Sequence, residues 1–388
     1  MRIIRKTHEE LQEIKKKYNC KELWSWSKFN TYKTSWYEYF LKYVIKPRVP
    51  EDRCDSAYAP YGGAAHTILE NYYSGKIKYE DMIKDFEDVL FTLELSGLKF
   101  DRTNDDKNKN TSAKYSIDIK HFFQNHKAIT SKVDIERFLV IKVGEHIFQG
   151  YADLVKKDED GNFIIQDWKT SSIYKGAKID AEKGQLILYA EGLNQLGVPL
   201  NKIRICWNFL KYCNVTIQQA NGKSTQRQIE RIKIGESLQS NAKMWLKKLG
   251  YIDDLDYYLE SLLQTNSIEC LPQDVQERYV FDDCYVYIPL NENAINDLNT
   301  NIIETIAEIK NKENKYHETK DDTLFWDEDV DSESYYFAVL CGYSAKIHKP
   351  YGKYLEDQKI KEQNKDNLFA GVGTDQIQED DMSWLDNI

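Results

Sequence analysis

The sequence lacks any long hydrophobic run. Its 388 residues are 41% hydrophobic, but no stretch of about 18 uncharged apolar residues occurs, the length that a membrane-spanning helix needs. The first residues, MRIIRKTHEELQEIKKKYN, form a charged helical pattern without the apolar stretch of a signal peptide. We therefore expect a soluble cytoplasmic protein with at least one large core, and its length suggests two or three structural units.

Cysteine pairs of the kind that bind zinc or carry redox chemistry are also missing. The cysteines are odd in number, and no two of them have a CxxC spacing. We expect free, mostly buried thiols in a reducing compartment. The seven are Cys20, Cys54, Cys206, Cys213, Cys270, Cys284 and Cys341.

The chain has no excess of positive charge. Its net charge is −10, but the residues from Glu313 onward hold 18 acidic and 8 basic side chains, whereas the first 312 residues hold 45 of each. This balance argues against a passive, nonspecific DNA coat, because phosphate affinity comes largely from Lys and Arg. It does not exclude an enzyme whose basic residues line one local channel.

Two common catalytic motifs are absent. Gly222-Lys223-Ser224 superficially resembles a phosphate-binding loop, but Ile217 occupies the position of the first glycine. Any helicase or ATPase activity would therefore have to come from a partner. No nucleophile elbow or Ser-His-Asp pattern indicates another class of hydrolase.

The segment from Leu23 to Val44 carries aromatic residues at helical spacing. Ser27 or Asn30 is the expected helix cap. Two interpretations remain open, a core-packing face and a wall of aromatic rings near a nucleic-acid strand. The residues concerned are Phe29, Tyr32, Trp36, Tyr39, Phe40 and Tyr43.

The next segments are predicted to be helical. A glycine turn at 62–63 leads into a helix that continues to about Ser74, and a second helix covers Tyr79 to Leu95. The polar run from Asp101 to Ser112 is expected to be a loop or a disordered insert.

From Glu136 the hydrophobic period changes to two, which predicts strands. The order strand, strand, strand, helix, strand behind a leading helix predicts an α/β fold with a mixed central sheet flanked by helices. The strands are 138–143, 146–156, 163–169 and 203–210, the helix is 181–196, a hairpin at 215–234 turns at Asn221-Gly222, and 235–263 and 291–315 are helical. The expected regions are an N-terminal helical segment at 1–56, a core at 57–212, a hairpin and helical region at 213–355 and an acidic flexible tail at 356–388.

Three ionisable groups are expected at one edge of this sheet. Asp167 and Lys169 are two residues apart on a predicted strand, so both side chains emerge on one face. Asp153 ends the preceding strand, which the short turn at 158–162 brings alongside. Because FIIQDWK is a largely apolar strand, it places its charged residues where burial without a partner is costly. We therefore expect a charged partner or a metal there.

Two carboxylates without cysteine are hard oxygen ligands of the kind that Mg²⁺ or Mn²⁺ takes. A metal ion held there lowers the pKa of a bound water and neutralises charge on a phosphate being cleaved. Lys169 would orient or deprotonate the attacking water, or stabilise the developing charge. These are the requirements of phosphodiester hydrolysis.

This pattern resembles the PD-(D/E)xK nuclease superfamily, with Ala152 in place of the nominal proline. His66, in Gly62-Gly-Ala-Ala-His, matches the G-x-x-x-H motif of the RecB-like branch, and Gln185 to Tyr189 matches its Q-x-x-x-Y motif. The resemblance covers roughly 23–210 and implies a metal-dependent DNA exonuclease or end-processing enzyme in recombination, repair or phage DNA metabolism, in the cytoplasm of a bacterium or phage-infected host. It implies that His66, Asp153, Asp167 and the backbone carbonyl of Trp168 hold the metal, that Asp153, Asp167 and Lys169 are catalytic, and that Gln185 and Tyr189 contact DNA, at linear or single-stranded ends.

Many relatives hold an iron–sulfur cluster between their N-terminal motif and a C-terminal segment. Here the region from Tyr335 to Tyr354 resembles that segment, but Thr34 and Ser35 stand in the N-terminal motif, and Gly342, Tyr343 and Ser344 follow Cys341. Four thiolates at usable spacing are missing, so we expect no iron–sulfur cluster.

Each assignment has a plainer alternative. Asp167 and Lys169 could be a solvated pair, His66 an ordinary helix residue, and Gln185 and Tyr189 helix surface and core. Without catalysis, the fold would be a silent module that binds DNA or a replication or recombination partner. Phosphate contacts and a solvated loop are both open for Lys175, Lys178 and Lys183.

The acidic C-terminal tail, which ends in QEDDMSWLDNI, has two interpretations. Apolar residues after an acidic cluster suit docking into a basic-rimmed groove of a replication or single-strand-binding partner. The alternative is a tail that only increases solubility. Neither interpretation involves a membrane.

Overall fold

The computed structural model describes residues 5–46, 57–101, 104–326 and 360. The chain divides into two compact units, which we describe separately: unit 1 comprises Met1–Asn30 and Val49–Asn311, and unit 2 comprises Thr31–Arg48 and Lys312–Ile388. The segments Tyr335 to Tyr354 and Gly371 to Ile388, together with Cys54 and Cys341, lie outside the described residues.

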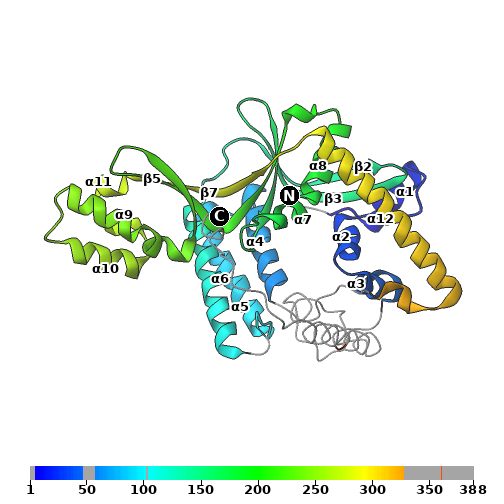
Figure 1. Cartoon of the computed structure of the whole chain (residues 1–388), viewed down its shortest axis with the longest axis horizontal. Helices are drawn as coiled ribbons and strands as arrows, with labels where there is room; N and C mark the ends of the chain where they lie inside the picture. Colours follow the sequence, from blue (N-terminus) through cyan, green and yellow to red (C-terminus); the bar gives the residue numbers. More distant parts are fainter. Residues whose placement is uncertain (1–4, 47–56, 102–103, 327–359, 361–388) are drawn as a thin grey trace, which may run out of the picture. The chain divides into compact units, whose positions relative to one another are not determined.

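A mixed sheet forms the centre of unit 1 (Figure 1). Its strands run in the order β1-β3-β4-β5-β6, with β2 paired to β3 and β7 paired to β5. The pairs β1–β3 and β4–β5 are parallel, and the others are antiparallel. The strands are β1 Leu23–Trp24, β2 Val133–Val143, β3 His146–Lys157, β4 Phe163–Lys169, β5 Ile203–Gln218, β6 Ser224–Glu230 and β7 Tyr279–Ile288.

Helices cover this sheet, so the predicted α/β class is confirmed. Helices α4, α5 and α6 form one core with Leu154, Trp168 and Leu210 of the sheet. Helix α8 lies against β2, where the Ile141 side chain packs directly on Gly192. The helices of unit 1 are α1 His8–Lys17, α4 Tyr58–Tyr73, α5 Met82–Leu95, α6 Asp105–Asn125, α7 Ala177–Glu182, α8 Gly184–Gln195, α9 Ile234–Lys248, α10 Leu255–Thr265 and α11 Gln273–Gln276, and two more, α2 Trp26–Thr34 and α12 Glu292–Thr319, continue into unit 2.

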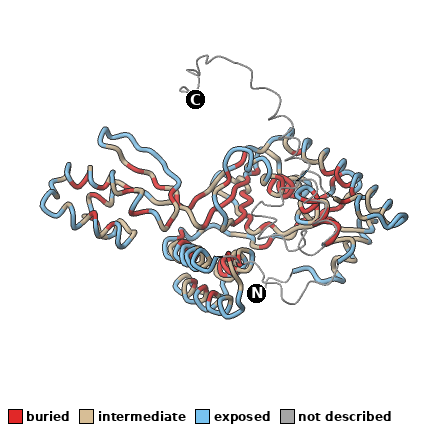
Figure 2. Tube along the Cα trace, turned by 60° about the horizontal axis from the view of Figure 1, so that its bottom comes forward, coloured by how far each residue is buried: buried red, intermediate tan, exposed pale blue. Residues whose placement is uncertain are grey.

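Burial follows this layering (Figure 2). Strand β4 is buried from Ile164 to Trp168, as expected of an inner strand with neighbours on both sides. Its predicted bounds, 163–169, are confirmed. The outer turns of α9 and α10 are exposed, while their inner faces join β5 and β6 in a second core of unit 1.

The β5–β6 hairpin is also confirmed. It turns at Gly222, which has a φ of 81° that favours glycine. Strand β7 was not predicted, although it lines β5 along most of that strand's length. Aromatic residues recur at every second position at both ends of YVFDDCYVYI, but the paired acids Asp282 and Asp283 between them obscure the hydrophobic pattern.

The predicted loop at 101–112 was wrong for most of its length. Helix α6 begins at Asp105, and the Asn104 side chain accepts a hydrogen bond from Lys107 N at 2.9 Å. Asn at the cap followed by Asp105 and Asp106 is a helix start that stabilises the helix dipole. The polar first turns are solvated, whereas later residues such as Phe122 are buried.

The helix predicted within the segment from Leu23 to Val44 is broken into shorter pieces. Strand β1 comes first, and α2 is capped by Ser25, not by Ser27 or Asn30, because Ser25 Oγ accepts from Lys28 N. Ser35 then caps α3 Trp36–Tyr39, which continues as a π-helical turn over Phe40–Ile45. Most of the aromatic rings are buried, which supports the core-packing interpretation.

Unit 2 combines α3 and the π-helical turn with the end of α12 and a 3₁₀ turn at Asp322–Phe325. Phe40 stacks on Phe325 with ring centroids 4.7 Å apart. Tyr39 donates a hydrogen bond to Glu313 at 2.9 Å, across 274 positions of sequence. These contacts join two distant segments of the chain.

Candidate active site

Strand β4 places Asp167 and Lys169 on one face of the sheet. The strand pairs with β5 in the register Asp167 with Trp207 and Lys169 with Phe209. The Lys169 ammonium lies 2.6 Å from Asp167 Oδ2. The two groups are therefore a close ion pair, as their spacing in the sequence predicts.

Asp153 lies where β3 and β4 separate. The last hydrogen-bonded pair between these strands is Leu154 with Gln166. One step further, Trp168 N donates to the side chain of Asp153, to Oδ2 at 2.9 Å. The carboxylate thus replaces a main-chain acceptor of the sheet, and this bond fixes Asp153 beside Asp167.

Helix α4 brings His66 to the same place. His66 Nδ1 lies 3.5 Å from Asp153 Oδ2, and its ring meets the Trp168 indole edge to face at 5.7 Å. One turn earlier, a Cβ at Gly62 would lie 3.1 Å from Thr170 Oγ1. A glycine four residues before the histidine therefore lets the helix approach the end of β4 closely.

Burial and neighbouring charges shift the pKa values of the site's ionisable groups. Burial, and then the neighbouring Asp167, raise the pKa of the Asp153 carboxyl well above its usual range, although Trp168 N and Lys169 oppose the shift. Burial lowers the pKa of His66. Burial alone would lower the pKa of Lys169, but Asp167, Tyr174 and Asp153 together more than offset burial, so this pKa is raised.

The donor set fits a hard divalent cation. Asp153 and Asp167 supply carboxylate oxygens, and Trp168 between Asp167 and Lys169 supplies a main-chain carbonyl. Within the described ranges, no three or more His, Cys, Asp or Glu side chains are grouped as a complete metal site. A metal here would therefore complete its coordination with the main chain, water and substrate oxygens.

Gln185 and Tyr189 lie on one face of α8, as predicted. Gln185 Nε2 donates to the Tyr189 hydroxyl at 3.1 Å. Tyr189 is 5% exposed, and burial raises its pKa to about 12. A Cβ at Gly150 would come within 2.6 Å of that hydroxyl, so the ring packs directly on the backbone of β3. Gln185 is the more accessible of the two.

The structure adds two acids that sequence reasoning missed. Glu136 of β2 lies opposite Asp153, between the pairs Ile135 with Leu154 and Arg137 with Ala152, and has a φ of 50°. Its carboxylate is buried and 3.5 Å from an Arg5 Nη atom. Only the strand register places it there, so no local signal could have identified it.

Glu70 was missed although a local signal existed. It follows His66 by four residues on α4 and therefore shares its helix face. Burial, and then Glu136, raise its pKa.

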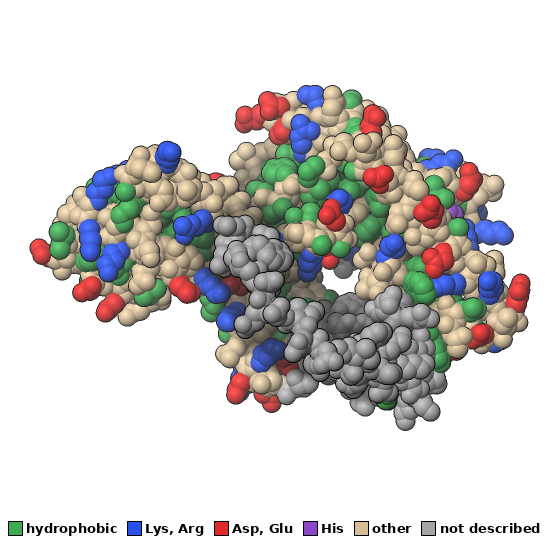
Figure 3. Space-filling model, in the orientation of Figure 1, with side chains coloured by type: hydrophobic (Ala, Val, Ile, Leu, Met, Phe, Trp, Pro, Cys, Tyr) green, Lys and Arg blue, Asp and Glu red, His purple; other side chains and the backbone are tan. Residues whose placement is uncertain are grey.

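The lysines near the site have local contacts. Lys178 lies over the Tyr174 ring at 4.9 Å, and Lys183 pairs with Asp180 at 2.5 Å. On the face of unit 1 shown in Figure 3, Lys and Arg side chains are interspersed with Asp and Glu. Whether these lysines contact phosphate stays a prediction.

The described cysteines Cys20, Cys206, Cys213, Cys270 and Cys284 are free thiols. None of the helices in the described part of the chain is both long and apolar enough to cross a bilayer.

Comparison with known families agrees with this geometry. A family model described as the PD-(D/E)XK nuclease superfamily matches residues 23–321, which include β1 to β7 and every residue of the site described above except Arg5. The comparison with curated proteins gives no match. Nucleases of this superfamily generally use divalent metal ions.

Proposed function

Because the chain belongs to the PD-(D/E)XK nuclease superfamily, we propose that it is a metal-dependent DNA nuclease of the RecB-like branch. Its reaction is hydrolysis of phosphodiester bonds at linear or single-stranded DNA ends, as an exonuclease or end-processing enzyme in recombination, repair or phage DNA metabolism. The observation that carries this proposal is the meeting of Asp153, Asp167 and Lys169 where β3 and β4 separate.

Asp153, Asp167 and the Trp168 carbonyl would hold Mg²⁺ or Mn²⁺, with His66 as a further ligand beside Asp153. The bound ion supplies activation of water and neutralises charge on the scissile phosphate. Burial is the larger cause of the raised pKa of Asp153, and repulsion between the two acids adds to it. A cation between them would therefore offset a cost that folding has already imposed.

Lys169 is expected to act as a cation. Its raised pKa keeps the ammonium protonated at neutral pH, so it is unsuited to remove a proton from water. Instead it orients the attacking water and stabilises the negative charge that develops on the phosphate. Asp167, 2.6 Å away, fixes the ammonium in place.

Gln185 and Tyr189 have different roles in positioning the DNA strand. Tyr189 is buried against Gly150 and accepts the Gln185 hydrogen bond, so it fixes the orientation of the amide. The second Nε2 hydrogen and the carboxamide oxygen of Gln185 are left to bind the DNA. Gln185 is therefore the proposed contact, and Tyr189 its support.

The test is cleavage of end-labelled linear and circular DNA, single- and double-stranded, with Mg²⁺. Asp167→Ala and Lys169→Ala should each lower the cleavage rate by at least about 100-fold, because the first removes a proposed metal ligand and the second removes the cation that stabilises the developing negative charge. Lys157→Ala, at the far end of β3, is the matched control and should cleave normally. Circular dichroism checks that each variant is folded.

Binding to DNA without cleavage, on every DNA form and with either Mg²⁺ or Mn²⁺, would contradict the proposal. That result would favour the catalytically silent module. Cleavage of circular as well as linear DNA would identify an endonuclease and contradict only the proposed preference for ends.

A further inference from the structure

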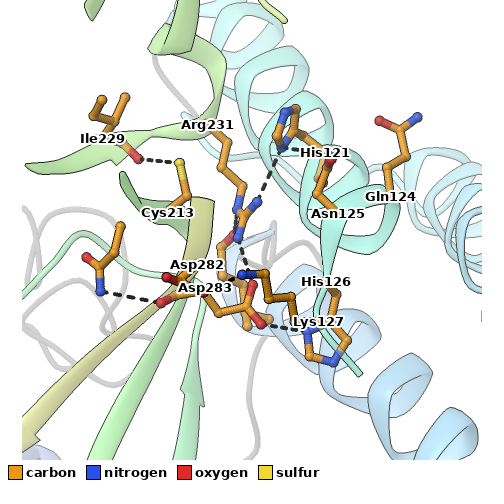
Figure 4. Close-up of polar contacts among 12 residues, drawn as sticks. His121, Gln124, Asn125, His126, Lys127, Cys213, Ile229, Arg231, Asp282 and Asp283 are labelled. Atoms are coloured by element: carbon orange, nitrogen blue, oxygen red, sulfur yellow. Dashed lines mark hydrogen bonds and ion pairs between the residues drawn. The ribbon is translucent and has the colours of Figure 1, made fainter. Parts of the chain in front are cut away.

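A buried chain of hydrogen bonds leads from β7 to the candidate active site. Asp283 accepts from Arg231 Nη2 at 3.0 Å, and its other oxygen lies 2.7 Å from His126 Nδ1. His126 Nε2 lies 2.5 Å from the Tyr73 hydroxyl. Figure 4 shows Arg231, Asp283 and His126 joined in this order, with His121 beside the guanidinium.

The hydrogen bonds between Tyr73, His126 and Asp283 all run in one direction from donor to acceptor. With the imidazole proton on Nδ1, His126 donates to Asp283 and accepts from Tyr73. The Tyr73 hydroxyl in turn accepts from Ile129 N at 3.3 Å. Every group is then a donor to the next toward Asp283, and such chains strengthen one another inside a protein.

An acid, an imidazole and a hydroxyl in this order have the arrangement of a catalytic relay, but burial excludes that role. The side chains of His126 and Asp283 are 1% and 2% exposed. The cavity of about 240 Å³ nearby is lined by Arg231 and Asp283 but not by His126 or Tyr73. No substrate reaches the imidazole, so these hydrogen-bonded residues have a structural role and catalyse no reaction of their own.

These residues fix the position of Trp168 through the Tyr73 ring. The Tyr73 ring lies parallel to the indole, with an interplanar angle of 13° and centroids 6.4 Å apart, and His66 contacts the indole edge to face. Tyr73 follows His66 by roughly two helical turns, so one face of α4 meets the indole at two places. The indole N–H has no hydrogen-bond partner among the described residues, so packing sets the ring's orientation.

We propose that Tyr73, His126 and Asp283 are positioning residues for the metal site, acting through Trp168. The Trp168 amide donates to Asp153, and its carbonyl is a proposed metal ligand. A change in the orientation of Trp168 would therefore move two proposed metal ligands together, the Asp153 carboxylate and the Trp168 carbonyl. The inference rests on the proposed function and names residues of that site beyond its direct contacts.

The test compares two tyrosines that hold the same segment. Tyr73→Phe removes the hydroxyl that binds His126 Nε2, whereas the control Tyr79→Phe removes a hydroxyl that donates to His126 O at 3.0 Å and Gln124 O at 3.2 Å. Of these two tyrosines, Tyr73 has a ring contact with Trp168, whereas the ring contact described for Tyr79 is with Tyr72. A merely structural role would affect both variants alike.

Mn²⁺ binding is measured by electron paramagnetic resonance without DNA, and cleavage kinetics are measured separately. Tyr73→Phe is expected to raise the Mn²⁺ dissociation constant about tenfold and to leave the KM for DNA unchanged. Tyr79→Phe is expected to lower the Tm without changing the Mn²⁺ dissociation constant. His126→Gln should raise the Mn²⁺ dissociation constant as much as Tyr73→Phe does. The double variant Tyr73→Phe/His126→Gln should bind Mn²⁺ no more weakly than either single variant, because both residues act through the same hydrogen bonds.

If Tyr73→Phe does not fold, Asp283→Asn tests the chain from its far end and should weaken Mn²⁺ binding in the same direction. Equal Mn²⁺ affinity in the wild type, Tyr73→Phe and Asp283→Asn would overturn this inference alone. A wild type that neither binds Mn²⁺ nor cleaves DNA would overturn the proposed function and this inference with it.

Discussion

Asp118 shows how one buried carboxyl group affects the stability of this protein. It lies on α6 without exposed surface, and Oδ1 accepts from Ile232 N at 2.8 Å. Oδ2 has no hydrogen-bond partner within the described residues. Burial, partly offset by the Ile232 bond, raises the pKa of Asp118 to about 7.

This shift predicts a pH-dependent stability. Between an aspartate's ordinary pKa of 3.8 and the raised pKa of about 7, the folded state binds more protons than the unfolded state, so the free energy of unfolding falls as pH rises through this window. Asp118→Asn keeps the Oδ1 acceptor and removes the ionisation. We expect it to raise the free energy of unfolding at pH 8 by about 1 to 3 kcal/mol.

Urea unfolding at pH 5 and pH 8 measures this effect. The gain from Asp118→Asn should be smaller at pH 5 and reach its full size at pH 8. Asp134→Asn, on the exposed surface of β2, is the control and should change neither value by much. An Asp118→Asn variant that is equally destabilised at both pH values would contradict the prediction.

At the site, the sequence predicted the residues whose spacing is local. Asp167 and Lys169 share a strand, and Gln185 and Tyr189 share a helix face, so periodicity alone pairs them. Glu136 was beyond such reasoning, because its place opposite Asp153 depends on the register of β2 against β3. The variants above test the roles of the predicted residues.

Among the elements, helix α8 depends on a glycine at its start. A Cβ at Gly184 would lie 2.1 Å from the Trp26 ring, which also packs on Phe29 with ring centroids 5.4 Å apart. The helix therefore accepts the entropic cost of glycine because an aromatic ring occupies the position of a side chain.

Gly184→Ala should accordingly destabilise the protein by about 1 to 3 kcal/mol, although alanine is the better helix former. Gly63→Ala is a matched control, because Gly63 is also helical and a Cβ there would meet nothing within 4 Å. It should be neutral or stabilise by up to about 1 kcal/mol. Thermal unfolding of both variants measures the difference, and equal effects would contradict this account.

Elements were predicted best where one hydrophobic period holds throughout. Strand β4 is largely apolar until Asp167, and its predicted bounds are confirmed. Helix α6 was mistaken for a loop because its first turns are solvated, and composition outweighed the cap at Asn104. Strand β7 was missed because Asp282 and Asp283 interrupt it, and Asp283 is buried only through its partners Arg231 and His126.

For the whole molecule, metal binding and folding stability should be coupled. Asp153 and Asp167 lie close together in the folded protein, whereas the unfolded chain separates them. An ion that binds only the folded state raises the Tm with its concentration. Wild-type protein is thus expected to show a higher Tm in about 10 mM Mg²⁺ than in EDTA.

Asp153→Asn should reverse this pattern. It removes the repulsion between the two acids and keeps an acceptor for Trp168 N, so its Tm in EDTA should exceed that of the wild type. Its response to Mg²⁺ and its cleavage activity should both be lost. Differential scanning fluorimetry across a Mg²⁺ titration makes the comparison, and a full Mg²⁺ response in Asp153→Asn would count against this residue as a ligand.

The pairing of β5 also constrains the order in which the protein matures during synthesis. Strand β5 is complete at Gln218, but one of its edges hydrogen-bonds to β7, which ends only at Ile288. A nascent chain that stops short of β7 therefore exposes an open strand edge and lacks Asp283. The ribosome has to translate about 120 codons beyond Lys169 before β7 can complete the sheet that carries Asp153 and Asp167.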